Sequence, residues 1–246
     1  MNLYLAAQED PRGPAVQSVR FARVCTHVPD GAPRAAMSGD ILLFCPNERP
    51  VGADDTIAPR LIHCCRQGDF SGLVADLAPP LTQDEARLSA ALDSACAAAH
   101  LPLWVTEEYA SYTRHAHILI CTALSGGTLR RRLAECADQY GAHRLALDCQ
   151  RLAVDLTIPS PSGEGMALTL ADLARLRQGR SCFYSDALCA NYFTYRTGAY
   201  HHFVLYDNAE TLRRKIALGE QFGIRDAFFM LPEVADLLEE LFQAKK

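Results

Sequence analysis

Residues 70–80, FSGLVADLAPP, decide how the fold of this chain is interpreted. The run is almost entirely apolar, it contains a single carboxylate, Asp76, and Pro79 and Pro80 stop it. A short apolar run bounded by prolines is typical of a strand that is covered on both faces, as in a parallel sheet. Asp76 therefore stands at the end of a buried strand, which is where parallel α/β folds carry functional groups.

The same pattern recurs along the chain. Apolar runs predict strands over residues 2–6, 19–25, 40–45, 101–106, 117–123, 144–147 and 227–231. Amphipathic or capped segments predict helices over residues 56–68, 82–100, 128–140, 208–222 and 234–243. Alternating strands and helices imply a parallel sheet, and about eight strands over this length favour a (β/α)8 TIM-type barrel. An open doubly wound sheet is the alternative, because residues 1–40 are poorly patterned.

Residues 176–207 have a different character from the rest. They contain the aromatic stretch FYSDALCANYFTYRTGAYHHFVLYD, with a turn expected between Tyr195 and Tyr200. Aromatic runs on either side of a glycine-containing turn predict an antiparallel hairpin. We therefore expect one barrel domain over residues 1–246, with a small α+β hairpin insertion at residues 176–207 before the last strand.

Composition and charge narrow the classes of partner that we expect the protein to bind. The formal net charge is −5, the isoelectric point is near 5.9, and the 24 Lys and Arg residues are scattered, which argues against a nucleic-acid partner. No run has the length of a membrane span, and the first residues lack the basic start of a signal peptide, so we expect a cytoplasmic protein without membrane contact. The oligomeric state is left open.

The ten cysteines lie mostly inside apolar runs, which predicts buried reduced thiols rather than disulfides. No CxxC pair is present, and the tight group His63-Cys64-Cys65 is interpreted as a helix face. Motifs for dinucleotides, for P-loop phosphate binding, for zincins and for serine hydrolases are absent. We therefore expect neither a metal nor a cofactor.

The C-terminal third carries a resemblance to a known family. Asp155–Pro159 (DLTIP), Tyr192–Tyr195 (YFTY) and residues 201–232 (HHFVLYDNAETLRRKIALGEQFGIRDAFFMLP) follow in an order and spacing that resemble the family-18 glycoside hydrolases. More specifically, these segments resemble the bacterial spore-associated branch, which acts on peptidoglycan-like glycans. The resemblance covers roughly residues 70–232, and it implies a barrel with an inserted hairpin.

In that register, residues 70–80 become the fourth barrel strand, where the family carries the signature DGxDxDxE. The Glu of the signature is the general acid, and the preceding Asp orients the N-acetyl group that serves as nucleophile. Asp76 matches that Asp, whereas Ser71 and Val74 replace the earlier two acids and Ala78 stands in place of the Glu. A methyl group cannot donate a proton, so the resemblance implies that the usual hydrolysis is lost.

Two further positions agree with this loss. The family's MTYD segment after the sixth strand becomes Cys121-Thr-Ala-Leu124, which lacks the tyrosine that holds the acetamide. The tryptophan that forms the floor of the family's sugar-binding subsite becomes Met230. Met230 is therefore a candidate ligand contact, with a thioether side chain in place of the indole ring.

Another carboxylate could replace the missing acid. Glu107 and Glu108 follow the strand at 101–106, and burial could give either one the raised pKa that a general acid needs. The alternative is that both side chains lie in water at the start of a loop or helix. The candidate catalytic residues are Asp76, Glu107 and Glu108, although Asp76 could instead accept hydrogen bonds within the proline turn.

Candidate ligand contacts lie nearby. Asp148 ends the next strand, and Asp155 matches an aspartate of the family for which we favour a role in fixing the loop. Tyr109 and Tyr112 are placed at the rim, where they could stack on sugar rings. Trp104 could also stack, but its position in the middle of a strand favours the core.

Three functional hypotheses follow. The first is a family-18-like barrel without hydrolytic activity, which keeps a cleft for a glycan or a small ligand. The second is an active glycosidase on N-acetylated glycans with Glu107 or Glu108 as a relocated acid. The third is an intracellular interaction protein that uses the barrel as a scaffold.

Overall fold

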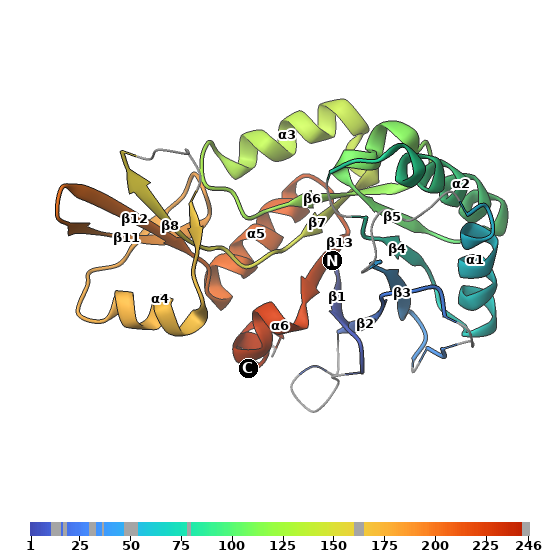
Figure 1. The fold of residues 1–246 in the computed structure, drawn as a ribbon, viewed down its shortest axis with the longest axis horizontal. Helices are drawn as coiled ribbons and strands as arrows, with labels where there is room; N and C mark the ends of the chain where they lie inside the picture. The colour runs from blue at the N-terminus through green and yellow to red at the C-terminus, as the bar shows by residue number, and fades with distance from the viewer. Residues whose placement is uncertain are drawn as a thin grey trace.

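The computed structural model describes residues 1–246 except residues 11–15, 17–18, 30–32, 36, 47–53, 78–79, 160–164 and 243–246. Eight strands close into a barrel within these described residues (Figure 1). In order around the barrel they are β1 (Asn2–Ala7), β13 (Asp226–Met230), β7 (Leu145–Asp148), β6 (His117–Cys121), β5 (Leu103–Thr106), β4 (Leu73–Ala75), β3 (Ile41–Phe44) and β2 (Arg20–Cys25). All neighbouring pairs are parallel, which confirms the TIM-type α/β barrel and excludes the open sheet.

The expected helices lie on the outside of the barrel. They are α1 (Ile57–Gln67), α2 (Gln83–Ala99), α3 (Leu129–Tyr140) and α5 (Ala209–Gln221), with the short 3-10 turns η2 (Glu107–Tyr112) and η3 (Ala142–Arg144). The start of α2 follows from its sequence, because Thr82 Oγ1 accepts a hydrogen bond from the Glu85 N–H at 3.2 Å. Asn208 caps α5 in the same way, accepting from the Thr211 N–H at 2.9 Å.

Strand alternation separates two cores. In β4, Leu73 and Ala75 join the large cluster between the strands and the helices, whereas Val74 joins a second cluster with Trp104 and Phe228. The second cluster fills the barrel interior, because successive side chains of a strand point to opposite faces. Trp104 is 4% exposed in this interior, so it belongs to the core, as its mid-strand position favours.

A second sheet lies beside the barrel at the left of Figure 1. Its strands, in order, are β10 (Phe183–Ser185), β11 (Ala190–Thr197), β12 (Tyr200–Tyr206), β8 (Ala153–Ile158) and β9 (Met166–Ala167), and α4 (Leu170–Arg177) packs on one face. The expected aromatic hairpin is β11–β12. The sheet also contains β8 and β9, because β8 pairs antiparallel with β12 rather than with a barrel strand.

The chain enters the second sheet at Leu152 and leaves it at Asp207, and these two residues meet beside a buried ion pair. Lys215 Nζ donates to Asp207 Oδ2 at 2.6 Å, and both side chains are completely buried. Asp207 Oδ2 also accepts from the Leu152 N–H at 2.9 Å, and Oδ1 accepts from Thr211 Oγ1 at 2.8 Å. Asp207 therefore links the start of the insertion, the end of β12 and the first turn of α5.

After β13 the chain forms α6 (Leu231–Val234), η4 (Ala235–Leu237) and α7 (Leu238–Phe242). The helix expected over residues 234–243 is thus broken into short turns, and residue 243 lies outside the described part. None of the helices in the described ranges combines the length and the apolar character that crossing a membrane would require.

Candidate functional site

The carboxyl ends of the barrel strands form an acidic mouth. Asp76 comes directly after β4, Asp148 ends β7, Glu108 lies in η2 after β5, and Glu233 lies in α6 after β13. Asp76 and Asp148 are half-buried, and each is two residues beyond an interior side chain, Val74 or Ala146. Continued alternation directs both carboxylates inward at the mouth. We call these four side chains the mouth carboxylates.

The titration of Asp148 is strongly perturbed. Burial, together with the negative charges of Asp76, Glu233 and Glu108, raises the pKa of Asp148 to about 7. Gln150 opposes this rise, because its Nε2 donates to Asp148 Oδ2 at 2.7 Å. A carboxyl group whose pKa is near 7 is partly protonated at physiological pH, so it can either donate or accept a hydrogen bond.

Neutral side chains complete the mouth. Met230, at the end of β13, packs against the interior cluster from above. Cys121 ends β6 and its Sγ contacts Gln150 Oε1 at 3.5 Å. Burial raises the pKa of the Cys121 thiol, so it is a poor nucleophile at neutral pH.

The contacts of Glu107 lie on α3 and not at the mouth, which argues against its role as a relocated acid. Its carboxylate forms an ion pair with Arg132 and accepts a hydrogen bond from the Tyr140 hydroxyl at 3.4 Å, and both partners lie on α3. The side chain thus points outward between η2 and a helix. Glu108 is exposed and is the member of the pair whose charge reaches Asp148.

The expected position of Tyr109 at the rim of the mouth is wrong. It is completely buried, and its hydroxyl donates to Glu85 Oε2 of α2 at 2.9 Å, so it cannot stack on a ligand. The 3-10 turn η2 rotates Tyr109 under the neighbouring helix, which strand periodicity alone could not indicate. Tyr112 is 43% exposed.

Asp155 lies in β8 of the second sheet and not at the mouth. Its carboxylate accepts from the Tyr195 hydroxyl at 2.6 Å and contacts His202 Nδ1 at 3.0 Å. These three side chains come from adjacent strands β8, β11 and β12 and hold them in register. The loop-fixing role expected for Asp155 becomes a role in the sheet.

The sequence did not single out the aromatic face of the second sheet. Phe183, Tyr192 and Phe203 form a ladder, with ring centroids 5.5 Å and 4.8 Å apart, on the face opposite α4. Ala123, two residues beyond β6, belongs to the same apolar cluster as Tyr192 and Phe203. The aromatic face therefore adjoins the mouth, and alternation of large apolar residues in β11 and β12 was the signal for it.

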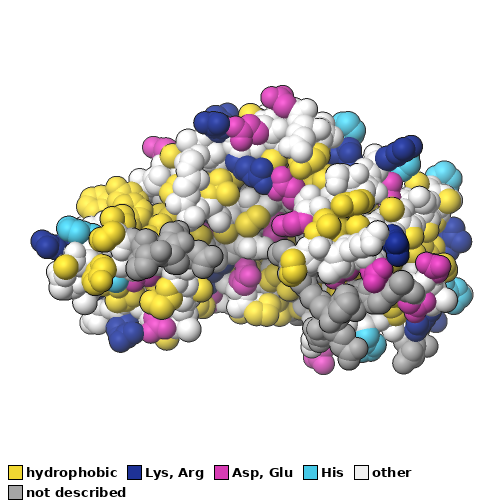
Figure 2. Space-filling model, turned by 45° about the horizontal axis from the view of Figure 1, so that its top comes forward, with side chains coloured by type: hydrophobic (Ala, Val, Ile, Leu, Met, Phe, Trp, Pro, Cys, Tyr) yellow, Lys and Arg dark blue, Asp and Glu magenta, His cyan; other side chains and the backbone are white. Residues whose placement is uncertain are grey.

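Figure 2 shows hydrophobic side chains gathered over the end of the molecule that the second sheet forms. Ala78 lies outside the described residues, so the loss of the signature Glu rests on the sequence. Within the described ranges, no group of three or more His, Cys, Asp or Glu side chains is arranged to hold a metal ion.

Comparison with known proteins defines the fold class. No family model matches the sequence, and no curated protein matches it. Among solved structures, the spore cortex-lytic enzyme SleL of Bacillus cereus is similar over 100% of this chain and 75% of its own, with a TM-score of 0.58 and 13% identity. A chitinase of Chromobacterium violaceum is similar over 85% of this chain and 80% of its own, with a TM-score of 0.56 and 16% identity.

A class V chitinase mutant of Cycas revoluta, solved in complex with (GlcNAc)3, is similar over 91% of this chain and 79% of its own, with a TM-score of 0.52 and 12% identity. The chain therefore has the fold of the family-18 chitinases and spore cortex-lytic enzymes. At these identities the likeness extends to the fold alone, and the chemistry has to be argued from the mouth.

Proposed function

We propose that this protein binds a glycan across the barrel mouth and the aromatic face, and that it does not hydrolyse the glycan with the acid that its structural relatives' family uses. The observation that carries this proposal is the continuity of two surfaces, because Ala123 joins the aromatic ladder to the end of β6. A chain of sugars could contact both surfaces at once.

The chemistry of the two surfaces suits a glycan. Phe183 is 53% exposed, and with Tyr192 and Phe203 it offers flat apolar area for the apolar faces of sugar rings. The mouth carboxylates offer acceptors for sugar hydroxyl groups. Binding clefts commonly combine apolar lining with a few convergent polar groups. The (GlcNAc)3 ligand of the Cycas revoluta structure supports a glycan of N-acetylated sugars as the first to test.

Loss of hydrolysis is supported by the sequence and by the direction of Glu107. Ala78 has no proton to donate, and Glu107 is held by Arg132 on the outside of the barrel. General acid catalysis typically contributes about 10²- to 10⁴-fold, so an enzyme without the acid would be slow.

The test is titration with N-acetylglucosamine oligosaccharides by calorimetry and by NMR. We expect wild-type binding that is weakened in Phe183→Ala, whereas Tyr200→Ala should bind like the wild type. Tyr200 is the matched control, since it is 48% exposed and β12 alternation places it on the opposite face from Phe203. Absence of wild-type binding, or equal binding by both variants, would contradict the proposal.

A second function is favoured by one observation. With a pKa of about 7, Asp148 carries a proton for part of the time at neutral pH, as a general acid must. In this alternative, Asp148 would protonate the glycosidic oxygen and Asp76 would support the reacting sugar. Wild-type hydrolysis of N-acetylated oligosaccharides that Asp148→Asn abolishes, with binding retained, would establish this alternative and overturn the loss of activity.

A further inference from the structure

A groove separate from the mouth lies between the second sheet's helix and the C-terminal turns. It has a volume of about 520 Å³ and is lined by α4 and the turn after it on one side, and by Arg151 and Asp236 on the other. None of the mouth carboxylates lines it. A volume of this size is within the range of about 300–1,000 Å³ that is usual for small-molecule sites.

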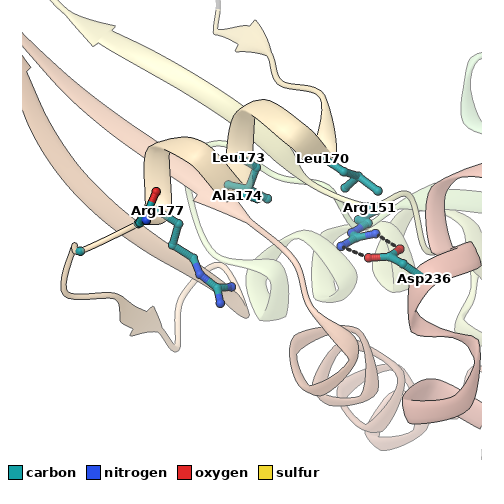
Figure 3. A pocket seen from close by; sticks show the side chains of 8 residues that line it. Arg151, Leu170, Leu173, Ala174, Arg177 and Asp236 are labelled. Carbon is teal, nitrogen blue, oxygen red and sulfur yellow. Dashed lines mark hydrogen bonds and ion pairs between the residues drawn. The ribbon is translucent and has the colours of Figure 1, made fainter.

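Cationic groups stand at both ends of the groove. Figure 3 shows the Arg151–Asp236 pair at one end and Arg177 at the other, with the side chains of Leu173 and Ala174 between them. Arg151 donates from its terminal nitrogens to Asp236 Oδ1 at 2.5 Å and to Oδ2 at 3.2 Å. Its side chain is 9% exposed, and its Nε has no hydrogen-bond partner in the described part of the chain.

Arg177 differs from Arg151 because no carboxylate of the described residues forms an ion pair with it. Its guanidinium group hydrogen-bonds the side chain of Tyr206, lies 5.7 Å from the centroid of that ring and is exposed on the surface. The charges that line the groove are therefore Arg151, Arg177 and Asp236, which leave one positive charge in excess. One monovalent anion would neutralise this charge.

The wall between the arginines is apolar. Leu170, Leu173 and Ala174 of α4 line the groove. Leu170 is 41% exposed, so its side chain is accessible to a bound molecule. Gln178 adds an amide at the C-terminal end of the helix. An anion bound here would therefore have an apolar body of a few carbon atoms in addition to its charged group.

We propose that this groove is a second binding site for a small organic monoanion, namely a carboxylate with an aryl or short alkyl body. The forked guanidinium of Arg177 receives the carboxylate, because a planar fork matches the two carboxylate oxygens. Leu170, Leu173 and Ala174 contact the apolar body. This site is independent of the proposed glycan-binding surface and stands if that surface binds nothing.

The test uses 4-phenylbutanoate as the probe and NMR of the full chain as the readout. We expect saturable shifts in the amide signals of residues 170–179 and of Arg151, and weaker binding of both acetate and the neutral analogue 4-phenylbutanol. Arg177→Gln should weaken binding of 4-phenylbutanoate about tenfold, because a charge-assisted hydrogen bond is lost.

Arg175→Gln is the matched control. Arg175 lies on the same helix, but its guanidinium pairs with Asp172 at 2.7 Å and does not line the groove. Both substituted side chains are on the surface, so both variants should keep the wild-type melting temperature. Equal affinity of the two variants, equal binding of 4-phenylbutanol, or tighter binding of inorganic phosphate than of 4-phenylbutanoate would each overturn the proposal.

Discussion

At the scale of single residues, Asp148 combines burial with three negative neighbours. A carboxylate in such a place is destabilised relative to its protonated form, so the folded protein holds a proton at a pH where the unfolded chain has released it. The pKa is about 7 in the folded protein and near 4 in an unfolded chain. This difference links protonation of the mouth to stability.

The sign of this linkage gives a first prediction. Asp148 contributes stability that is fully present below a pH near 4 and is lost as the pH rises to about 7. Asp148→Asn keeps the shape but removes the charge, so its free energy of unfolding should exceed the wild-type value more at pH 8 than at pH 4. Urea unfolding of both proteins across this range measures the difference.

Asp138→Asn serves as the control for this experiment, because it removes an exposed carboxylate from α3. Its difference from the wild type should stay nearly constant with pH. Parallel curves of unfolding free energy against pH for wild type and Asp148→Asn between pH 4 and pH 8 would contradict the prediction. They would mean that Asp148 titrates in the same way in the folded and in the unfolded protein.

Lys215 supports a second prediction. Lys215→Met leaves the Asp207 carboxylate buried without its cation, and breaking a buried pair in this way costs about 3–5 kcal/mol. We expect a loss of this size in the free energy of unfolding by urea. Arg131→Met should leave the free energy of unfolding nearly unchanged, because its pair with Glu135 lies in water. Similar losses in the two variants would contradict the prediction.

At the scale of elements, Gly72 explains how β4 approaches β5. A Cβ atom on Gly72 would lie 2.5 Å from Trp104 Cζ3 and 3.3 Å from Ile41 Cγ2, so the glycine makes room for the indole ring. A side chain at this point would displace the largest ring of the barrel interior.

Gly72→Ala should therefore destabilise the barrel by about 1–3 kcal/mol through overpacking. Because Trp104 is the single tryptophan of the chain, its fluorescence spectrum should shift in the folded variant. Gly126→Ala is the matched control, since no described atom lies within 4 Å of the position that its new methyl group would occupy and its backbone needs no left-handed conformation. An unchanged spectrum and stability in Gly72→Ala would refute this account of β4.

Sequence patterns predicted the elements better than the directions of side chains at their ends. Apolar runs marked the barrel strands, and Thr82 and Asn208 marked helix starts, because both signals are local. Glu107 and Tyr109 were assigned to the mouth but point to α3 and α2, because the 3-10 turn η2 sets their directions. Such a turn depends on contacts between elements and leaves no period in the sequence.

At the scale of the whole molecule, the chain has separate apolar cores. The barrel has one cluster inside it and one under its helices, whereas the second sheet has its own clusters on its two faces. The two ends of the insertion meet at Asp207. The Asp207 carboxylate accepts hydrogen bonds from the Leu152 N–H and from Lys215, and these bonds connect the second sheet to the barrel. Structural units with separate cores can open independently of each other.

This arrangement gives the last prediction. Phe193 is completely buried in the sheet's core beneath α4, and Phe193→Ala should cost about 3–5 kcal/mol there. We expect faster amide hydrogen exchange in β8, β11 and β12, with protection of the barrel strands unchanged. Leu92→Ala, in the cluster between α2 and the barrel, should instead speed exchange in the barrel.

The pair of variants decides where one cooperative unit ends and the next begins. If Phe193→Ala speeds exchange in β1 to β7 as strongly as in the second sheet, the chain unfolds as one unit and the two cores are coupled. If the effect stops at Asp207 and Leu152, the insertion is a separate unit that extends from β8 to β12. The aromatic face could then open or close beside the mouth without disturbing the barrel that carries Asp76 and Asp148.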